Sequence, residues 1–158
     1  IGVKIMAEDW AMCNPDTGEV QYVMSINDNT QYTNGGNYNG LKTILIPAET
    51  DHVALIDLNY YDYSAETFES RGARPTAYYK WNTSKQWEVD TTTLMVDLRT
   101  ERNIRLENCD WTQLADSPLS SEVKGYWVTY RQSLRDITKD LKDDLDTLDG
   151  FAWPAAPS

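Results

Sequence analysis

The sequence predicts an α+β protein, in which an N-terminal antiparallel β module over residues 1–90 is followed by a C-terminal helical hairpin over residues 91–158. Two observations support this division. Up to Val89, apolar and polar residues alternate in short runs between turn residues, which is typical of strands with one buried face. From Asp90 onward, apolar residues recur every three to four positions, which is the spacing of amphipathic helices.

Composition limits the class of protein. The chain has 158 residues, of which 41% are hydrophobic, and this is enough apolar surface for a folded core. Its apolar runs are far shorter than the roughly 20 residues that a membrane-spanning helix needs. The net charge of −11 repels phosphate groups. We therefore expect a soluble, globular protein that binds neither nucleic acid nor membrane.

Sequence signatures of catalysis and metal binding are missing. Cys13 and Cys109 form no C-x-x-C pair, so we expect both to be small buried side chains. His52 is the only histidine, which excludes two-histidine metal motifs, and no phosphate-binding glycine motif occurs. The acidic residues after Asp136 do not have the spacing of a calcium-binding EF-hand loop. We predict no catalytic residues, no metal and no cofactor, and hence no enzyme.

The β module begins with a predicted hairpin. A Pro- and Gly-containing turn, Asn14–Gly18, separates a strand at Trp10–Cys13 from a strand at Glu19–Ile26, whose apolar residues alternate. The next segment, Asn27–Gly40, is rich in Asn and Gly and has no apolar periodicity. It is predicted to be a long exposed loop.

Three further segments of the β module carry weaker patterns. Leu41–Ile46 is predicted to be a strand that ends at Pro47, because proline cannot donate a hydrogen bond to a neighbouring strand. His52–Leu58 is predicted to be another strand. Ser64 is placed to cap a brief helical turn over Thr67–Ser70.

An aromatic hairpin is predicted to close the β module. Thr76–Trp81 and Gln86–Val89 are two aromatic-rich β segments, and a four-residue polar loop joins them. Their tyrosines and tryptophans can form cross-strand pairs.

The first long helix is predicted to start after Asp90 or Thr91 and to run to about Asn108. One face of it carries an apolar stripe, which we expect to face the core: Leu94, Met95, Leu98, Leu106 and Cys109.

Two arginines lie within or beside this stripe. A buried unpaired charge is very costly, so Arg102 and Arg105 need partners. We predict a structural role in which one of them bonds to the following loop, with Asp110 and Asp116 as the leading acceptors. The alternative is that both side chains extend to solvent.

The second helix is predicted to begin at Ser120 or Ser121, after Pro118. Its stripe is regular: Val123, Trp127, Tyr130, Leu134, Ile137, Leu141, Leu145 and Leu148. A single helix with this stripe has about 28 residues and a length of roughly 40 Å. Asp143, Asp144, Asp146 and Asp149 disfavour its last turns, because the carboxyl end of a helix repels negative charge. Gly150 is placed to end it, and Trp153–Pro154 to fold back as a tail.

Several motifs in this half resemble a known family. In chain order they are R-x-x-R-N-x-x-L (Arg99–Leu106), C-D-W-T-Q (Cys109–Gln113), D-x-P-L-S (Asp116–Ser120), W-x-x-Y-R-Q-x-L-R-D-I (Trp127–Ile137) and a final W-P (Trp153–Pro154). Residues 95–155 thereby resemble the phage tail assembly chaperone-like domain. Such domains occur in tail-fibre assembly proteins and at the ends of some tail-fibre proteins. Arg74–Trp87 is similar to the short β segment that often precedes the domain.

The resemblance implies a non-enzymatic role in which the chain helps a tail fibre to fold, trimerise or be capped. The implied partner is a tail-fibre protein, expected to be trimeric, or another tail or baseplate protein. The implied location is the virion tail, the cytoplasm of the infected bacterium, or both. On this basis the expected partner-binding residues are Trp111, Gln113, Trp127, Tyr130, Arg131 and Trp153. For Trp127 and Tyr130, ordinary core packing is the simpler interpretation.

Two other functions remain open from the residues. One is a purely structural virion subunit, such as a small fibre, adaptor or decoration protein. The other is a glycan-binding fibre tip that uses the exposed tyrosines expected in the β module: Tyr32, Tyr38, Tyr60, Tyr61 and Tyr63.

Overall fold

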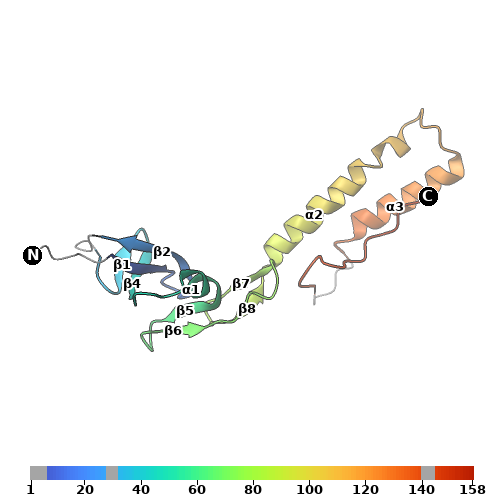
Figure 1. Ribbon diagram of the computed structural model, residues 1–158. Coiled ribbons are helices and arrows are strands. Elements are labelled where there is room, and N and C mark those ends of the chain that lie inside the picture. The colour runs from blue at the N-terminus through green and yellow to red at the C-terminus, as the bar shows by residue number, and fades with distance from the viewer. Residues whose placement is uncertain (1–6, 28–31, 140–144) are drawn as a thin grey trace, which may run out of the picture. The chain divides into compact units, whose positions relative to one another are not determined.

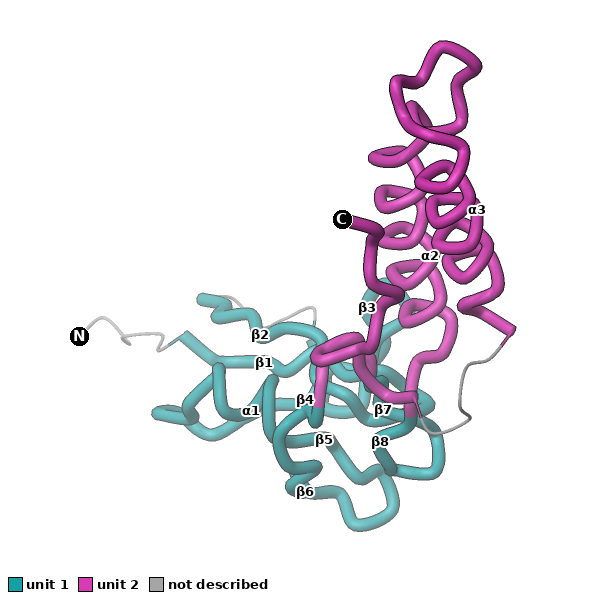
Figure 2. The backbone as a smooth tube through the Cα atoms, turned by 90° about the vertical axis from the view of Figure 1, so that its right-hand side faces the viewer, with its two compact units in different colours: residues 1–75, 79–88 teal, residues 76–78, 89–158 magenta. Residues whose placement is uncertain are grey.

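The structure is a computed structural model that describes residues 7–27, 32–139 and 145–158. It confirms the predicted α+β class, with antiparallel sheets in the N-terminal half and two long helices in the C-terminal half. The chain forms two compact units (Figure 2). Unit 1 comprises residues 1–75 and 79–88, and unit 2 comprises residues 76–78 and 89–158.

Unit 1 is built on a four-stranded antiparallel sheet with the order β2-β1-β4-β3. Its strands are β1 (Glu8–Cys13), β2 (Val20–Ile26), β3 (Gly36–Tyr38) and β4 (Leu41–Ile46). The predicted first hairpin is confirmed, because β1 pairs with β2 and Trp10 lies opposite Met24. The strand ending at Ile46 is also confirmed. The segment predicted as a loop contains β3, and its residues 28–31 lie outside the described residues.

Gly18 ends the first turn at a position that only glycine fits. Its φ is +72°, in the region that side-chain-bearing residues rarely adopt. The amide of Tyr61 donates a hydrogen bond of 2.8 Å to its carbonyl oxygen. A Cβ added to Gly18 would lie 2.1 Å from the carbonyl oxygen of Tyr61. The turn and the distant strand β5 (Asn59–Asp62) therefore approach too closely for any other residue.

The prediction of a strand at His52–Leu58 is wrong, because this segment is the helix α1 (His52–Leu58). The Asp51 carboxylate caps it by accepting hydrogen bonds from the amides of Val53 and Ala54. A short apolar run has the same composition in a strand and in a buried helical segment. The capping aspartate decides the outcome here, since it satisfies amides that a strand would not leave free.

The predicted helical turn at Thr67–Ser70 is also wrong. This segment is the strand β6 (Thr67–Ser70), which pairs antiparallel with β5 (Asn59–Asp62). The turn between them is capped by the Asp62 carboxylate, which accepts from the amides of Ser64 and Ala65. Glu66 adopts a positive φ of 56°. Pairing with β5 gives these residues backbone partners that an isolated helical turn of four residues would lack.

The predicted aromatic hairpin is confirmed. It consists of β7 (Tyr79–Trp81) and β8 (Trp87–Val89), which form a two-stranded sheet. The rings of Trp81 and Trp87 meet edge to face with centroids 5.3 Å apart. Arg71 lies over Trp87, with its guanidinium carbon 4.9 Å from the ring centroid.

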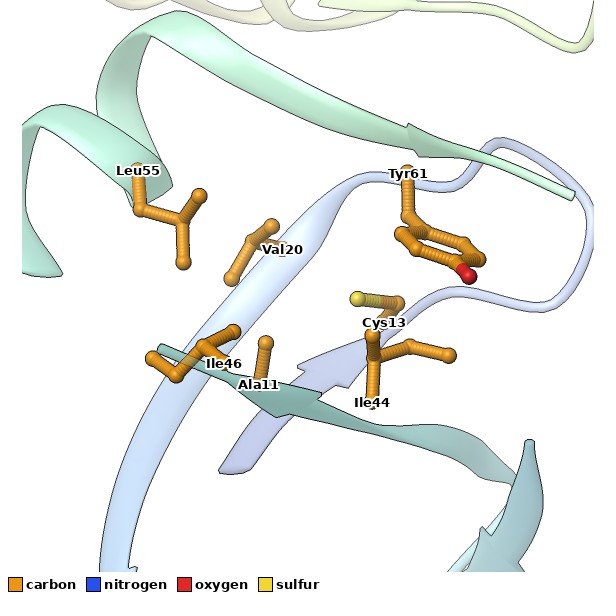
Figure 3. Packing of buried hydrophobic residues seen from close by; sticks show 7 residues of the cluster. All are labelled: Ala11, Cys13, Val20, Ile44, Ile46, Leu55 and Tyr61. Carbon is orange, nitrogen blue, oxygen red and sulfur yellow. The ribbon is translucent and has the colours of Figure 1, made fainter. Parts of the chain in front are cut away.

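The main buried cluster of unit 1 consists of hydrophobic side chains. Figure 3 shows side chains from β1, β2, β4, α1 and β5 pointing toward one another. These are Ala11, Cys13, Val20, Ile44, Ile46, Leu55 and Tyr61, each less than a tenth exposed. Burial raises the pKa of the Cys13 thiol to about 12, so this cysteine is a neutral packing residue, as predicted.

Unit 2 is a helical hairpin. The helix α2 (Thr91–Glu107) begins at Asp90, whose side chain accepts from the amide of Thr93. The helix α3 (Ser121–Asp136) begins at Ser120, whose hydroxyl accepts from the amide of Val123. A 3₁₀ turn, η1 (Asp110–Gln113), lies between them. α2 and α3 lie side by side (Figure 1). Both predicted helix starts are confirmed, and the predicted stripe residues Leu94 and Leu98 are buried.

The second helix is shorter than the 28 residues of a continuous helix, as the acidic residues near its expected end indicated. α3 ends at Asp136, and Leu145 and Leu148 lie in non-helical chain. Leu141, Asp143 and Asp144 lie outside the described residues. The acidic composition of this segment explains the early end, since carboxylates are destabilising at the carboxyl end of a helix. Asp136 itself accepts from Lys139 Nζ at 2.5 Å, just beyond the last turn.

The final segment folds back on unit 2, as predicted. Gly150 turns the chain with a φ of +72°. Trp153 packs against the buried cluster of α2 and α3 residues, and the guanidinium carbon of Arg105 lies 4.5 Å from its ring centroid. Among the described residues, no helix is both long and apolar enough to cross a membrane.

Candidate functional site

A buried arginine on α3 holds the end of α2 and the turn that follows it. The Arg131 side chain, on α3, is 9% exposed. One of its terminal nitrogens donates to the Leu106 carbonyl oxygen at 2.7 Å and to Cys109 Sγ at 3.0 Å. The other lies 2.6 Å from Asp110 Oδ1. A single planar guanidinium thus holds the carboxyl end of α2 and the first residue of η1 against α3.

The electrostatics of this contact favour the charged arginine. Burial by itself lowers the pKa of Arg131, but the hydrogen bonds that its guanidinium donates to Asp110 and Cys109 outweigh this effect, and the pKa lies above its ordinary value. The Leu106 carbonyl is one of the carbonyls that the end of a helix leaves without an intrahelical partner. A cation is favourable at that end of α2. Arg131 therefore satisfies backbone as well as side-chain groups.

Cys109 and Thr112 complete the buried side of the turn. Cys109 is 2% exposed, which confirms its predicted burial, and its thiol lies 3.2 Å from the Leu106 carbonyl oxygen. The Thr112 hydroxyl is fully buried and donates to the Cys109 carbonyl oxygen at 2.6 Å. The motif C-D-W-T therefore has a structural explanation. Its first, second and fourth residues build the turn that receives Arg131.

The third residue of that motif faces outward. Trp111 is 46% exposed and Leu114, which follows the turn, is 55% exposed. We name these two residues the turn surface. The Trp111 ring lies 6.4 Å from that of Trp127, which is half-buried. The packing of α2 and α3 therefore fixes the base of the turn and leaves its large apolar side chains in solvent.

The predicted pairing of the α2 arginines is wrong. Arg102 donates to Asn103 Oδ1, and Arg105 forms an ion pair of 2.9 Å with Glu101 one turn earlier on α2. Asp110, the predicted acceptor, binds Arg131 instead. Asp116, the other predicted acceptor, is exposed. Helical geometry explains the difference, because Glu101 and Arg105 are neighbours on one face, one turn apart.

Three predicted partner-binding residues form the aromatic side of the buried cluster. Tyr130 is 7% exposed, and its ring meets that of Trp127 edge to face at 5.6 Å. Trp127 and Trp153 are partly buried against this cluster. Together with Arg131, these residues stabilise the hairpin. Gln113 is exposed, and its amide donates to the Thr112 hydroxyl at 2.8 Å.

Arg131 was expected only as a partner-binding residue, and its buried contact was not predicted. A signal for it existed in the sequence. Trp127, Tyr130, Arg131 and Leu134 follow the i, i+3, i+4, i+7 pattern of a buried helix face. A charged residue on such a face needs a polar partner, and Cys109 and Asp110 of the C-D motif supply it.

A hollow of about 800 Å³ lies between α3 and the final segment of unit 2. Thr129, Gln132 and Ser133 line it on the helix, and Phe151 and Pro154 line it on the final segment. Its helix side offers hydrogen-bonding groups, whereas the turn surface offers large apolar side chains.

The tyrosines proposed for glycan binding do not form one surface. Tyr61 is buried in the core of unit 1, and the Tyr63 hydroxyl donates to the Asn14 carbonyl oxygen at 2.9 Å. The rings of Tyr60 and Trp81 lie 5.2 Å apart and are tilted relative to each other. Tyr32 and Tyr38 meet edge to face at 5.3 Å. Among the residues that the structure describes, no cluster of His, Cys, Asp or Glu side chains is arranged to hold a metal ion.

The hairpin therefore combines an exposed tryptophan with a well-packed interior, and this combination makes it a candidate protein-binding module. Residues 95–158 match the family model described as phage tail assembly chaperone protein, in agreement with the resemblance that the motifs of residues 95–155 indicated. The match supports a role in phage tail assembly. It covers less than half of the chain. Searches of curated proteins and of solved structures found no match.

Proposed function

We propose that the chain is a tail-fibre assembly chaperone or a fibre-associated virion protein that binds a tail-fibre protein through the turn surface of unit 2. The observation that carries the proposal is the 46% exposure of Trp111 within a matched chaperone domain whose neighbouring motif residues are buried. Tryptophan is among the residues most enriched at binding hot spots.

The buried residues of the motif support this division of roles. Arg131, Cys109 and Thr112 have their hydrogen bonds satisfied within the hairpin. They fix the backbone of η1, and this rigidity lowers the entropy that a partner must remove when it binds Trp111. In this proposal the role is non-enzymatic, and the site of action is the infected bacterium, the virion tail, or both.

Co-expression tests the proposal. The chain is produced together with a tail-fibre protein of the same phage, and the soluble yield and co-purification of the fibre are measured. A chaperone raises the soluble yield and is retained on the fibre during purification. Unchanged yield together with no co-purification would remove the chaperone interpretation.

The content of purified particles separates the two forms of the proposal. A chaperone that acts only during assembly is found in the infected lysate and is absent from purified phage. Stoichiometric presence in purified phage identifies a fibre-associated virion protein. This second outcome also fits a purely structural subunit, which would not raise the soluble yield of the fibre.

A further inference from the structure

Unit 1 contains a pocket that the proposed function does not use. It has a volume of about 530 Å³, within the range of small-molecule sites in proteins. Its lining includes three cationic side chains, Arg71, Arg74 and Lys80, and two indole rings, Trp81 and Trp87. The net charge of the chain is −11. Cations gathered at one concave site in so acidic a protein indicate an anionic ligand.

The Arg71 side chain is fixed as a wall of this pocket. It is 6% exposed and its guanidinium donates to Glu19 Oε1 and to the Ile56 carbonyl oxygen, both at 2.6 Å. Its guanidinium carbon lies 4.9 Å from the centroid of Trp87, whose indole nitrogen donates to the Arg71 carbonyl oxygen at 2.9 Å. The ring and the guanidinium hold each other in place before any ligand binds.

Two donors in this wall lack acceptors. Within the described residues, the buried Nε of Arg71 and the buried indole nitrogen of Trp81 have no hydrogen-bond partner. Buried donors without partners are rare, because each costs the free energy of its lost hydration. Both belong to residues that line the pocket. A ligand with acceptor oxygens would supply what this wall lacks.

The balance of charge selects the kind of anion. Glu19 and Asp57 also line the pocket; Glu19 is paired with Arg71, and Lys80 lies 3.4 Å from Glu88. Because carboxylates already lie beside these cations, the pocket suits a singly charged carboxylate better than a doubly charged phosphate. Arg74 and Lys80, both exposed at the surface, are placed to meet that charge. We propose that this pocket binds a carboxylate group carried beside an apolar ring or chain, as in an acidic sugar or a glutamate side chain.

NMR titration tests this with three probes. Glucuronate, glucose and propionate are added separately to the full chain, and the indole N–H signals of Trp81 and Trp87 are followed. Glucuronate is expected to shift them saturably, and glucose, which has the same ring without the charge, to bind at least tenfold more weakly. If propionate binds as tightly as glucuronate, the carboxylate alone is sufficient for binding. If propionate binds at least tenfold more weakly, the ligand is an acidic sugar. Equal binding of glucose and glucuronate, or binding of none, overturns the proposal.

A matched pair of double variants locates the site. Arg74→Gln with Lys80→Gln removes two positive charges from the pocket and keeps the buried Arg71. Lys42→Gln with Lys85→Gln removes the same charge from unit 1 outside the lining. The first variant is expected to weaken glucuronate binding at least tenfold and the second less than threefold. Equal weakening in both would contradict a local site. The dispersion of each spectrum shows that the variant is folded, and the turn surface of unit 2 is untouched.

Discussion

The two units of this protein differ in the kind of side chains that fill their interiors. In unit 1, the core consists of apolar side chains from two sheets and a short helix, and its tightest point is the approach of Gly18 to Tyr61. In unit 2, a guanidinium lies among the buried residues, and it binds a carbonyl, a thiol and a carboxylate. We therefore expect the stability of unit 1 to depend most on steric fit, and that of unit 2 on the hydrogen bonds of one charged group.

The largest expected effect is on unit 1. Gly18→Ala places a Cβ 2.1 Å from the Tyr61 carbonyl oxygen and requires a positive φ of an alanine. We expect it to lower the free energy of unfolding by about 3 kcal/mol or more, because backbone cannot move aside as a flexible side chain can. Hydrogen exchange followed by mass spectrometry should show lost protection in β1, β2 and β5, and a smaller change in α3.

Gly40→Ala is the matched control for this prediction. Gly40 also has a positive φ, of 83°, but nothing lies within 4 Å of the position of an added Cβ. Its cost is that of the backbone conformation alone, about 1 kcal/mol. Equal losses of unfolding free energy for the two variants would show that the close approach of Gly18 to Tyr61 does not determine the stability of unit 1.

The next effect is on unit 2. Arg131→Met keeps much of the apolar volume and removes the bonds of the guanidinium to the Leu106 carbonyl, to Cys109 Sγ and to the Asp110 carboxylate. We expect a loss of about 2 kcal/mol, because these charge-assisted bonds are lost together, although the Leu106 carbonyl keeps the Cys109 amide at 3.2 Å and Asp110 is 63% exposed and regains water. Thermal unfolding and exchange in α2 and α3 measure it.

Asp110→Asn provides the comparison within the same contact. The Asp110 side chain is largely exposed, so solvent screens its attraction to Arg131, and the expected loss is about 1 kcal/mol or less. A loss as large as that of Arg131→Met would mean that the ion pair with Asp110, rather than the bonds of Arg131 to Leu106 and Cys109, stabilises the hairpin.

The smallest expected effect is a pH dependence in unit 1. The Ser25 hydroxyl and His52 donate hydrogen bonds to Asp9, and together they hold the pKa of its carboxyl below the ordinary value of 3.8, although burial opposes them. A depressed pKa in the folded state contributes stability above the ordinary value, and this contribution is lost as the pH falls through the folded-state pKa. Asp9→Asn should therefore cost at most about 1 kcal/mol at neutral pH.

Measurement of the free energy of unfolding from pH 5 down to pH 2 checks this prediction. The difference between Asp9→Asn and the unmodified chain should shrink over this range. A difference that grows on acidification would show that the pKa is raised rather than lowered.

Local patterns predicted the elements that local interactions decide. Both long helices begin at the capping residues expected, Asp90 and Ser120, and the first hairpin turns at Asn14–Gly18. The errors occurred where two structures share one pattern. The apolar run His52–Leu58 suits strand and helix alike, and the cap at Asp51 decides it. Thr67–Ser70 is a strand only because β5 lies beside it.

The candidate site was predicted in its residues but not in their contacts. Spacing placed Arg102 and Arg105 near the apolar stripe of α2, yet it could not show which arginine reaches Asp110. That contact joins Asp110 of η1 to Arg131 of α3, and it depends on how these two elements pack. Sequence likewise could not separate Trp111 from Trp127, because both lie in the same motifs and only the fold leaves Trp111 more exposed.

The proposed use of the turn surface is tested most directly by Trp111→Ala, with Val96→Ala as control. Val96 lies on α2 and is 53% exposed, so both variants remove an exposed apolar side chain from unit 2. Each is co-expressed with the tail-fibre protein, and the amount of fibre retained on the purified chain is measured beside the melting temperature. Trp111→Ala should retain about tenfold less fibre at an unchanged melting temperature, as expected for a binding hot spot, and Val96→Ala should retain the full amount. Full retention by Trp111→Ala would contradict the assignment of the turn surface as the fibre-binding site.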